Sequence, residues 1–331
     1  MEKKTLLKVI VMPLLLMLLF PFSGSSIILR GNVYVDGFIN ITDVTNLVDT
    51  LLNSPSGGRI NCDVNGDLKV DISDVTSLVD FVLTGEHEWI RQVPPVPENA
   101  RVFTVNGVSF AMMPVEGGWY AANGGALLSH ELHDFYIGQT EVTHELWKAV
   151  MGEEQNSAIV YEPGPTDPVT HTTWQECQDF IVKLSELTGI EFRMPTYDQW
   201  QYAAIGGRLS QGYTYAGSDD IEEVAWYEGN WPEIFNWSLY IHTITLPVGL
   251  KKPNELGLYD MSGNVNEWVY GMPGVGEELI GYENGHLKMG GSTKTDANYC
   301  ETLWIHVEDS FNQGWIGGGF RLAVMASALG E

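Results

Sequence analysis

Basic residues are scarce in this sequence: 17 lysines and arginines stand against 43 aspartates and glutamates, which gives a formal net charge of −26. A nucleic-acid partner is therefore not expected, because neutralising phosphates needs lysine and arginine. Cysteine is also scarce. Three cysteines exclude a small scaffold held by several disulfides, and their spacing leaves open whether one disulfide forms.

The common catalytic motifs are missing. The chain has no Gly-x-Ser-x-Gly turn, no Gly-Lys-Ser/Thr phosphate loop and no His-Glu-x-x-His helix, since Lys148 stands where the second histidine would be. Spacing identifies no pair of acids as the acid and nucleophile of a glycosidase. The sequence therefore does not indicate a hydrolase of these classes.

The chain has enough residues for two domains. Its 331 residues include 44% hydrophobic and 11% aromatic residues, enough to bury a core. Thirty-six glycines and 18% charged residues indicate a turn-rich fold and not a coiled coil.

The first 26 residues have the pattern of a secretory signal peptide. Lys3, Lys4 and Lys8 precede an apolar run over residues 10–20, and small residues end at Ser26. This run is shorter than the roughly 20 apolar residues of a membrane helix, although an uncleaved anchor stays an alternative. We expect a secreted, cell-surface or periplasmic protein with no membrane span after cleavage.

A short repeat follows, in which residues 32–43 align with residues 63–74. Each copy precedes an amphipathic helical pattern with apolar residues at i, i+3, i+4, i+7 and i+8. Each also carries oxygen donors at the loop positions that calcium needs. The expected ligands are Asn32, Asp36, Phe38 (carbonyl), Asn40 and Asp43 in the first loop, and Asp63, Asn65, Asp67, Lys69 (carbonyl), Asp71 and Asp74 in the second.

Each loop departs from a complete calcium loop at a different position. Tyr34 occupies position 3 of the first loop, and Leu68 occupies position 6 of the second, where the turn favours glycine. A simpler alternative is an acidic turn whose Asp43 or Asp74 caps the following helix.

Two loop-helix units opening on Asp-Val-Asn-Gly-Asp at residues 63–67 resemble a dockerin module, over residues 27–86. The resemblance implies a small all-α calcium-binding domain that docks to a cohesin-type scaffold of a polysaccharide-degrading assembly. It also implies that loop positions 10 and 11 contact the cohesin; these are Ile41, Thr42, Ile72 and Ser73.

Residues 87–100 are proline-rich and predict a linker. Residues 101–331 alternate short apolar runs with glycine-rich turns, which indicates an α+β domain with much irregular structure. Helices are expected over residues 141–151, 174–188 and 198–204. Thr172 or Thr173 begins the second one, with Glu176 as a capping-box acid.

A series of phrases in this large domain resembles the formylglycine-generating enzyme, or sulfatase-modifying factor, family. They include Thr-Glu-Val-Thr at 140–143, Phe-Arg-Met-Pro-Thr at 192–196, Gly-Leu-Tyr-Asp-Met-Ser-Gly-Asn-Val at 257–265, Gly-Gly-Ser at 290–292 and Gly-Phe-Arg at 319–321. The resemblance implies a C-type-lectin-like fold. Active members oxidise a sulfatase cysteine with O₂ and copper.

The copper site of that family needs two cysteines five residues apart, because Cu(I) prefers two thiolates. Cys300 is matched to the first of them, and Ile305 stands five residues later. Cys177 or Cys62 is the remaining source of a second sulfur, yet Cys177 has the setting of a small buried residue. We therefore expect Cys300 to be a structural thiol, and catalytic only if the domain is an active oxidase.

The family resemblance also implies a calcium site built from Asp260, Gly263, Val265 and Glu267. The alternative for Glu267 is a buried ion pair with Arg321, which does not exclude a metal. A second family calcium site matches poorly around Ala225 and Trp226.

An aromatic stretch over residues 231–240 can stack on sugars or pack against other loops. The residues expected near Cys300 are Trp304, His306, Glu308, Asp309 and Trp315. We expect a non-catalytic domain that binds a peptide or glycan or has a structural role, with an active oxidase as the alternative.

Overall fold

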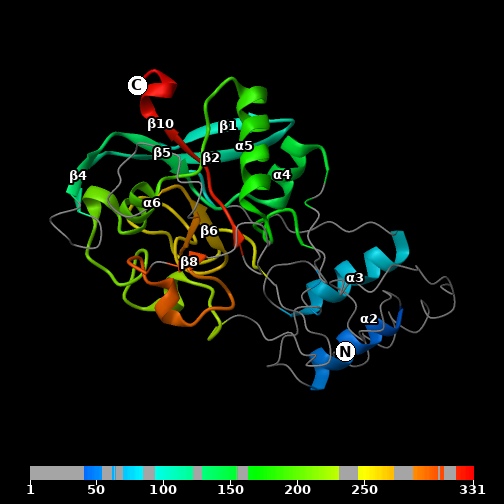
Figure 1. Ribbon diagram of the computed structural model, residues 1–331. Helices are drawn as coiled ribbons and strands as arrows, with labels where there is room; N and C mark the ends of the chain where they lie inside the picture. Colours follow the sequence, from blue (N-terminus) through cyan, green and yellow to red (C-terminus); the bar gives the residue numbers. More distant parts are fainter. Residues whose placement is uncertain are drawn as a thin grey trace. The chain divides into compact units, whose positions relative to one another are not determined.

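The computed structural model describes residues 41–53, 62, 64, 70–84, 94–121, 129–153, 155, 163–230, 245–271, 286–304, 306–308 and 318–331. These residues fall into two compact units. The small unit holds the helices α2 and α3, and the large unit holds the described residues from 94 onward (Figure 1). The predicted signal peptide lies outside the described residues. In the described part of the chain, no helix is both long and apolar enough to cross a membrane.

Helices α2 (Ile41–Asn53) and α3 (Ile72–Thr84) are the two amphipathic helices that the repeat predicts. Val44 and Leu47 of α2 and Val75 and Leu78 of α3 form one apolar cluster with Cys62 and Val64, which lie between the helices in sequence. The last apolar position of each pattern is instead exposed, with Leu52 at 47% and Leu83 at 54% exposure. Eight residues along a helix rotate a side chain by roughly 80°, which turns these leucines away from the cluster.

The described residues of the large unit form three small sheets. The first has the strand order β1 (Arg101–Val105), β2 (Val108–Val115), β5 (Phe135–Gly138) and β10 (Ala323–Met325), all antiparallel. The second pairs β3 (Gly118–Ala121) with β4 (Ser129–Leu132). The third has the order β8 (His306–Glu308), β7 (His286–Met289), β6 (Asn266–Val269) and β9 (Gly318–Gly319), and its β6–β9 pair is parallel. Together with the helices, these sheets make a mixed α and β unit with much irregular structure.

Three helices lie close to their predicted positions: α4 (His144–Met151), α5 (Trp174–Thr188) and α6 (Tyr197–Ala204). Thr173 and Glu176 form the predicted capping box of α5. Helix α4 begins three residues later than expected, because Val142 is still bonded to Phe320 and Val169 and Thr143 is the N-cap. The shorter segments are α7 (Ile221–Val224), η4 (Gly207–Leu209), η5 (Ala297–Cys300) and η6 (Ala326–Leu329).

Two apolar clusters form the core of the large unit. One joins α4 and α5 to the first sheet, which they lie beside in Figure 1, and it contains the stacked pair Trp147 and Phe180. The other surrounds α6 and Trp200. The end of the predicted linker packs on this unit, since Gln139 Nε2 donates to Pro95 O at 2.9 Å. Residues 94–100 are therefore part of the folded surface and not a free spacer.

Candidate functional site

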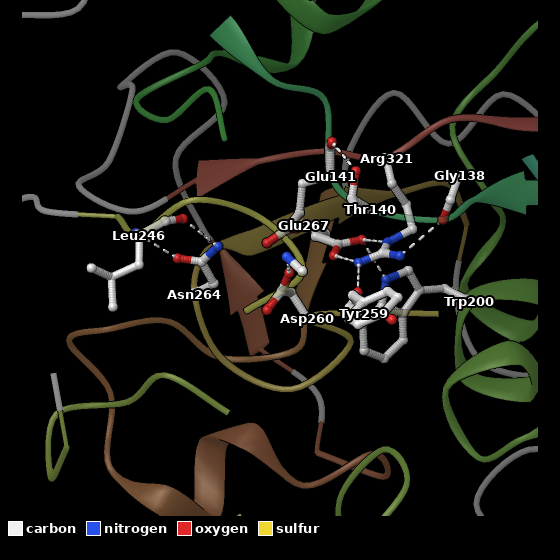
Figure 2. Close-up of polar contacts among 11 residues, drawn as sticks. Gly138, Thr140, Glu141, Trp200, Leu246, Tyr259, Asp260, Asn264, Glu267 and Arg321 are labelled. Carbon is white, nitrogen blue, oxygen red and sulfur yellow. Dashed lines mark hydrogen bonds and ion pairs between the residues drawn. The ribbon is translucent and has the colours of Figure 1, made fainter. Parts of the chain in front are cut away.

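A fully buried ion pair lies at the centre of the large unit (Figure 2). Glu267 is in the central strand β6, and Arg321 follows β9, so the parallel pairing of these strands brings the two side chains together. Arg321 donates from Nε to Oε2 and from Nη2 to Oε1 of Glu267, each at 2.6 Å. Both side chains have 0% exposure. Such a bidentate pair in a low-dielectric site holds both partners in one orientation.

Neighbouring groups complete the hydrogen bonds of this pair. Trp200 Nε1 on α6 donates to Glu267 Oε2 at 2.7 Å. Arg321 also donates from Nη1 to Gly138 O and from Nη2 to Tyr259 O, each at 3.0 Å. Arg321 therefore ties strand β5, the loop before β6 and the β6 carboxylate to one another.

Two further buried acids lie beside this pair, Glu141 and Asp260 (Figure 2). Among the described residues, no partner meets full hydrogen-bond geometry with either Glu141 carboxyl oxygen or with Asp260 Oδ1. Asp260 Oδ2 accepts from Gly249 N at 2.7 Å, and the neighbouring Glu141 carboxyl group acts on the pKa of Asp260 as a hydrogen-bond partner. Burial, followed by the charge of Asp260, raises the pKa of Glu141 well above its usual value. Burial also raises the pKa of Asp260, against the lowering effects of the Gly249 amide and of Arg321. Three acids thus share one guanidinium.

The four residues expected to bind calcium differ in whether their oxygen atoms are already hydrogen-bonded. Asp260 has a positive φ of 55° and an unpaired buried oxygen, which suits a donor for a hard cation. Both oxygens of Glu267 already accept hydrogen bonds. Gly263 has a positive φ of +84°, and a Cβ on this residue would lie 2.3 Å from Trp226 O, so the turn requires glycine. Val265 is fully buried. Among the described residues, no group of three or more acidic, histidine or cysteine side chains is arranged to hold a metal ion. The geometry thus leaves Asp260 Oδ1 available as a donor, whereas the Glu267 oxygens would have to share their hydrogen bonds with a metal ion. The four-ligand calcium set stays a prediction.

Cys300 ends η5 and is fully buried. Its Sγ lies 3.9 Å from Thr295 Oγ1 and 4.0 Å from Asp296 O. Gly291 packs directly against it, with φ +74° and a would-be Cβ only 2.7 Å from Sγ. Burial raises the pKa of the Cys300 thiol to about 12. The thiol is therefore neutral and enclosed at physiological pH.

The side chain next to this thiol is Thr295, five residues before Cys300. The sequence analysis sought the second thiolate five residues after it, at Ile305, which lies outside the described residues. Cys177 is bonded elsewhere, since its Sγ donates to Thr172 Oγ1 at 3.4 Å and it packs in the core around α5. In the part of the chain that the structure describes, a hydroxyl group and not a second sulfur lies beside the Cys300 thiol.

Of the aromatic and acidic residues expected near Cys300, Trp304 is described with its side chain. It is 37% exposed and packs edge-on against Tyr299, with ring centroids 5.0 Å apart. His306 and Glu308 belong to β8 by their backbone, whereas Asp309, Trp315 and the stretch 231–240 lie outside the described residues.

The predicted calcium loops of the small unit are described only in part. Asn32, Asp36, Phe38, Asn40, Asp63, Asn65, Asp67 and Lys69 lie outside the described residues, whereas Asp43, Asp71 and Asp74 are inside them. Asp74 is buried and accepts from Val64 N at 2.7 Å and from Asp71 N at 2.8 Å. The side chain that caps α3 is that of Asp71, which accepts from Ser73 N at 2.7 Å, whereas Asp74 lies inside the first turn. Calcium ligation by these loops stays a prediction.

Glu141 and Trp200 were not predicted as site residues, although Glu141 lies in the Thr-Glu-Val-Thr phrase at 140–143. Glu141 follows Thr140 in a segment expected to be helical, so its burial beside Asp260 was not foreseen. Its neighbours Gln139, Thr140 and Thr143 are polar, so the local sequence gives no signal of this burial.

Comparisons with known proteins agree with the resemblance of the large domain. The family model described as "Sulfatase-modifying factor enzyme 1-like domain" matches residues 91–326. The chain is 32% identical over 209 residues to "Chaperone protein LppX" of Paenibacillus barcinonensis, which covers 49% of this chain and 72% of that protein.

Two relatives carry the formylglycine name. Identity is 28% over 175 residues to the "Formylglycine-generating enzyme" of Streptomyces coelicolor, covering 48% of this chain and 53% of that one. The chain is also 29% identical over 103 residues to "Inactive C-alpha-formylglycine-generating enzyme 2" of Bos taurus. That match covers 31% of this chain and 32% of the relative. The chain thus spans about half the length of the first and a third of the second.

A solved structure, "Treponema denticola variable protein 1", aligns with a TM-score of 0.55 at 25% identity, over 70% of this chain and 100% of that one. PvdO from Pseudomonas aeruginosa aligns with a TM-score of 0.50 at 18% identity, over 70% and 100%, which is a likeness of fold alone.

Proposed function

Because the chain belongs to the sulfatase-modifying factor family through residues 91–326, we propose that this domain is a non-catalytic member that binds a ligand or has a structural role. The observation that carries the proposal is the pairing of Cys300 with Thr295 at 3.9 Å. A single enclosed thiol with a pKa of about 12 cannot supply the two thiolates that Cu(I) prefers. The family includes a relative named inactive, and another relative is named a chaperone, which is a binding role.

The test is incubation of the purified protein with copper, oxygen and a sulfatase-type Cys-x-Pro-x-Arg peptide, followed by mass spectrometry. No conversion of the peptide thiol to an aldehyde is expected. Aldehyde that forms with the wild type and disappears in Cys300→Ala would instead support the alternative, a copper- and O₂-dependent oxidase. A known active member, run in parallel, shows that the assay detects the product.

A C-type-lectin-like arrangement of the large domain suits a binding role, because surface loops then carry the specificity. We propose a peptide or glycan as the ligand, contacted through the aromatic stretch 231–240. Support comes from its composition, with Trp231, Phe235, Trp237 and Tyr240 within ten residues. Replacing Trp231 and Trp237 by alanine should abolish binding to a polysaccharide panel, and unchanged binding would remove this assignment.

For residues 27–86 we propose a calcium-dependent dockerin-like module of a secreted protein, which docks to a cohesin-type partner. Support comes from the duplicated ligand pattern and from equivalent positions in two helices: Ile41 and Thr42 begin α2, and Ile72 and Ser73 begin α3. Ile72 is 60% exposed, which suits a contact residue.

Calcium titration followed by circular dichroism tests this module. Helix content should rise with calcium in the wild type and respond less in Asp67→Asn, while Asp49→Asn on the exposed face of α2 serves as the control. A calcium response that is identical in all three proteins would contradict ligation by the second loop.

Calcium bound through Asp260 in the large domain is a separate proposal, supported by the unpaired Asp260 Oδ1. Metal analysis after gel filtration should find one calcium fewer per chain in Asp260→Asn than in the wild type. Equal calcium content in the wild type and Asp260→Asn would contradict calcium binding by Asp260. The three buried acids would then be balanced by Arg321 and by protonation alone.

A further inference from the structure

An exposed tryptophan lies on the two-stranded sheet of β3 and β4. Trp119 on β3 is 72% exposed, the highest exposure of any large apolar side chain among the described residues. It is in register with Glu131 on β4, which is also exposed. Residues in register on an antiparallel pair point to the same face, with Cβ atoms about 4.5–5.5 Å apart. The Trp119 indole and the Glu131 carboxylate are therefore neighbours on the outer face of this sheet.

The inner face of the same sheet is anchored in the core. Tyr120 and Leu132 follow Trp119 and Glu131 in sequence, so they point the opposite way, and both are buried. The Tyr120 hydroxyl group donates to Gln201 Oε1 on α6, and the Tyr120 ring packs edge-on against Tyr202 with ring centroids 5.6 Å apart. Trp119 is thus carried by a fixed support, which lowers the entropy lost when a ligand packs against it.

A hollow of about 500 Å³ adjoins the outer face, because Glu131 belongs to its lining. Asp134 and Arg208 line it as well. Arg208 Nε donates to Gly117 O, and Gly117 N donates to Asp134 Oδ1, each at 2.7 Å. These bonds hold a guanidinium and a carboxylate in the wall of the hollow. The hollow therefore offers hydrogen-bond donors and acceptors next to an exposed aromatic ring.

We propose that Trp119, Glu131 and this hollow form a binding site for a short neutral oligosaccharide. A sugar ring has a face of C–H groups, which stacks on an indole, and a rim of hydroxyl groups, which donate to carboxylates and accept from a guanidinium. A cationic peptide fits the hollow less well, because Arg208 repels it, and an anion is repelled by Glu131 and Asp134. The inference rests on the proposed binding role of the large domain, and it assigns the ligand to residues other than the stretch 231–240.

Isothermal titration calorimetry of the full chain tests the site. The probes are soluble oligosaccharides of glucose, xylose, mannose and galactose, with an oligolysine peptide as the charged comparison. At least one sugar should bind, with an affinity that added sodium chloride leaves unchanged, because the ligand carries no charge. Binding of the peptide alone would overturn the proposal, and so would failure of every sugar to bind.

Three variants make the test specific to this surface. Trp119→Ala removes the stacking ring and should weaken sugar binding by about tenfold or more, whereas Trp119→Phe keeps an aromatic ring and should retain most of the affinity. Tyr213→Ala is the control, at an aromatic residue that is 39% exposed on another segment, and it should bind as the wild type does. Because all of these side chains are exposed, urea unfolding should show the same stability in each protein.

The outcomes separate this site from the ligand proposed for residues 231–240. Equal affinities in the wild type and Trp119→Ala would overturn the site on β3 and β4. Loss of binding on replacing Trp231 and Trp237 in that case would leave the earlier assignment in place. A wild type that binds no sugar would remove both glycan assignments, whereas the aldehyde assay separately decides whether the domain is catalytic.

Discussion

Arg321 donates a hydrogen bond to each carboxylate oxygen of Glu267 at 2.6 Å, and neither side chain is exposed. The pair joins residues 54 positions apart and links β6 to the segment after β9. Because the remaining guanidinium donors go to Gly138 O and Tyr259 O, this one side chain fixes four segments of the large unit.

Removing one partner of this pair should unfold the large unit readily. Glu267→Gln removes the one carboxylate that Arg321 hydrogen-bonds and leaves only Glu141 and Asp260 nearby to balance the buried guanidinium, so the expected loss in the free energy of unfolding is roughly 3–5 kcal/mol. Urea unfolding monitored by tryptophan fluorescence measures it. The control is Glu223→Gln, which breaks the exposed pair with Lys252 and should cost about 0–1 kcal/mol. Equal losses in the two variants would contradict a structural role for the buried pair.

Local sequence signals predicted the helices well. Helix α5 spans the expected residues, because Thr173 and Glu176 form a capping box and Gly189 ends the helix in a left-handed conformation. These signals act within four residues and can be read from sequence alone. The repeat likewise predicted α2 and α3.

The central site was only partly predictable, because distant segments build it. Glu267 and Arg321 were foreseen as an alternative pair, but the burial of Glu141 beside Asp260 depends on how the first and third sheets meet. The position of Thr295 beside Cys300 was not foreseen either. A spacing of five residues fits position 295 as well as 305, and only the chain path after Gly291 shows that Thr295 lies next to the sulfur.

The Cys300 thiol should resist alkylation in the native protein. Its pKa of about 12 leaves about one thiol in 10⁴ ionised at pH 8, and burial also blocks access. Iodoacetamide labelling at pH 8, read by mass spectrometry of the Cys300 peptide, should be slow in buffer and fast in urea. Labelling at the same rate in both conditions would show that the thiol is accessible and would reopen its assignment as catalytic.

Restoring the second thiolate should restore copper binding. The 3.9 Å between Thr295 Oγ1 and Cys300 Sγ is below the ~4.6 Å span of two metal–sulfur bonds, so Thr295→Cys can place both sulfurs on one Cu(I) ion with small adjustments. Competition with a Cu(I) chelator should show tight binding in Thr295→Cys and none in the wild type. Ile305→Cys is the control, and tight binding in that variant alone would place the pair at 300 and 305 instead.

The buried ammonium of Lys294 should make stability depend on pH in a recognisable direction. Its pKa falls from 10.5 in the unfolded chain to about 8 in the folded one, so between these values the unfolded state binds more protons and stability rises with pH. Below pH 8 the folded protein carries the full cost of burying the charge, and Lys294→Met should be more stable than the wild type. That advantage should shrink from pH 8 towards 10.5.

Urea unfolding in chloride buffers measures the free energies of unfolding of the wild type and Lys294→Met at each pH. The contributions of the other lysines and tyrosines cancel in the difference between the two values. Lys252→Met should give a pH-independent difference, because that lysine is 63% exposed. An advantage that is constant from pH 7 to 10.5 would show that the gain comes from apolar packing and not from the removal of a buried charge.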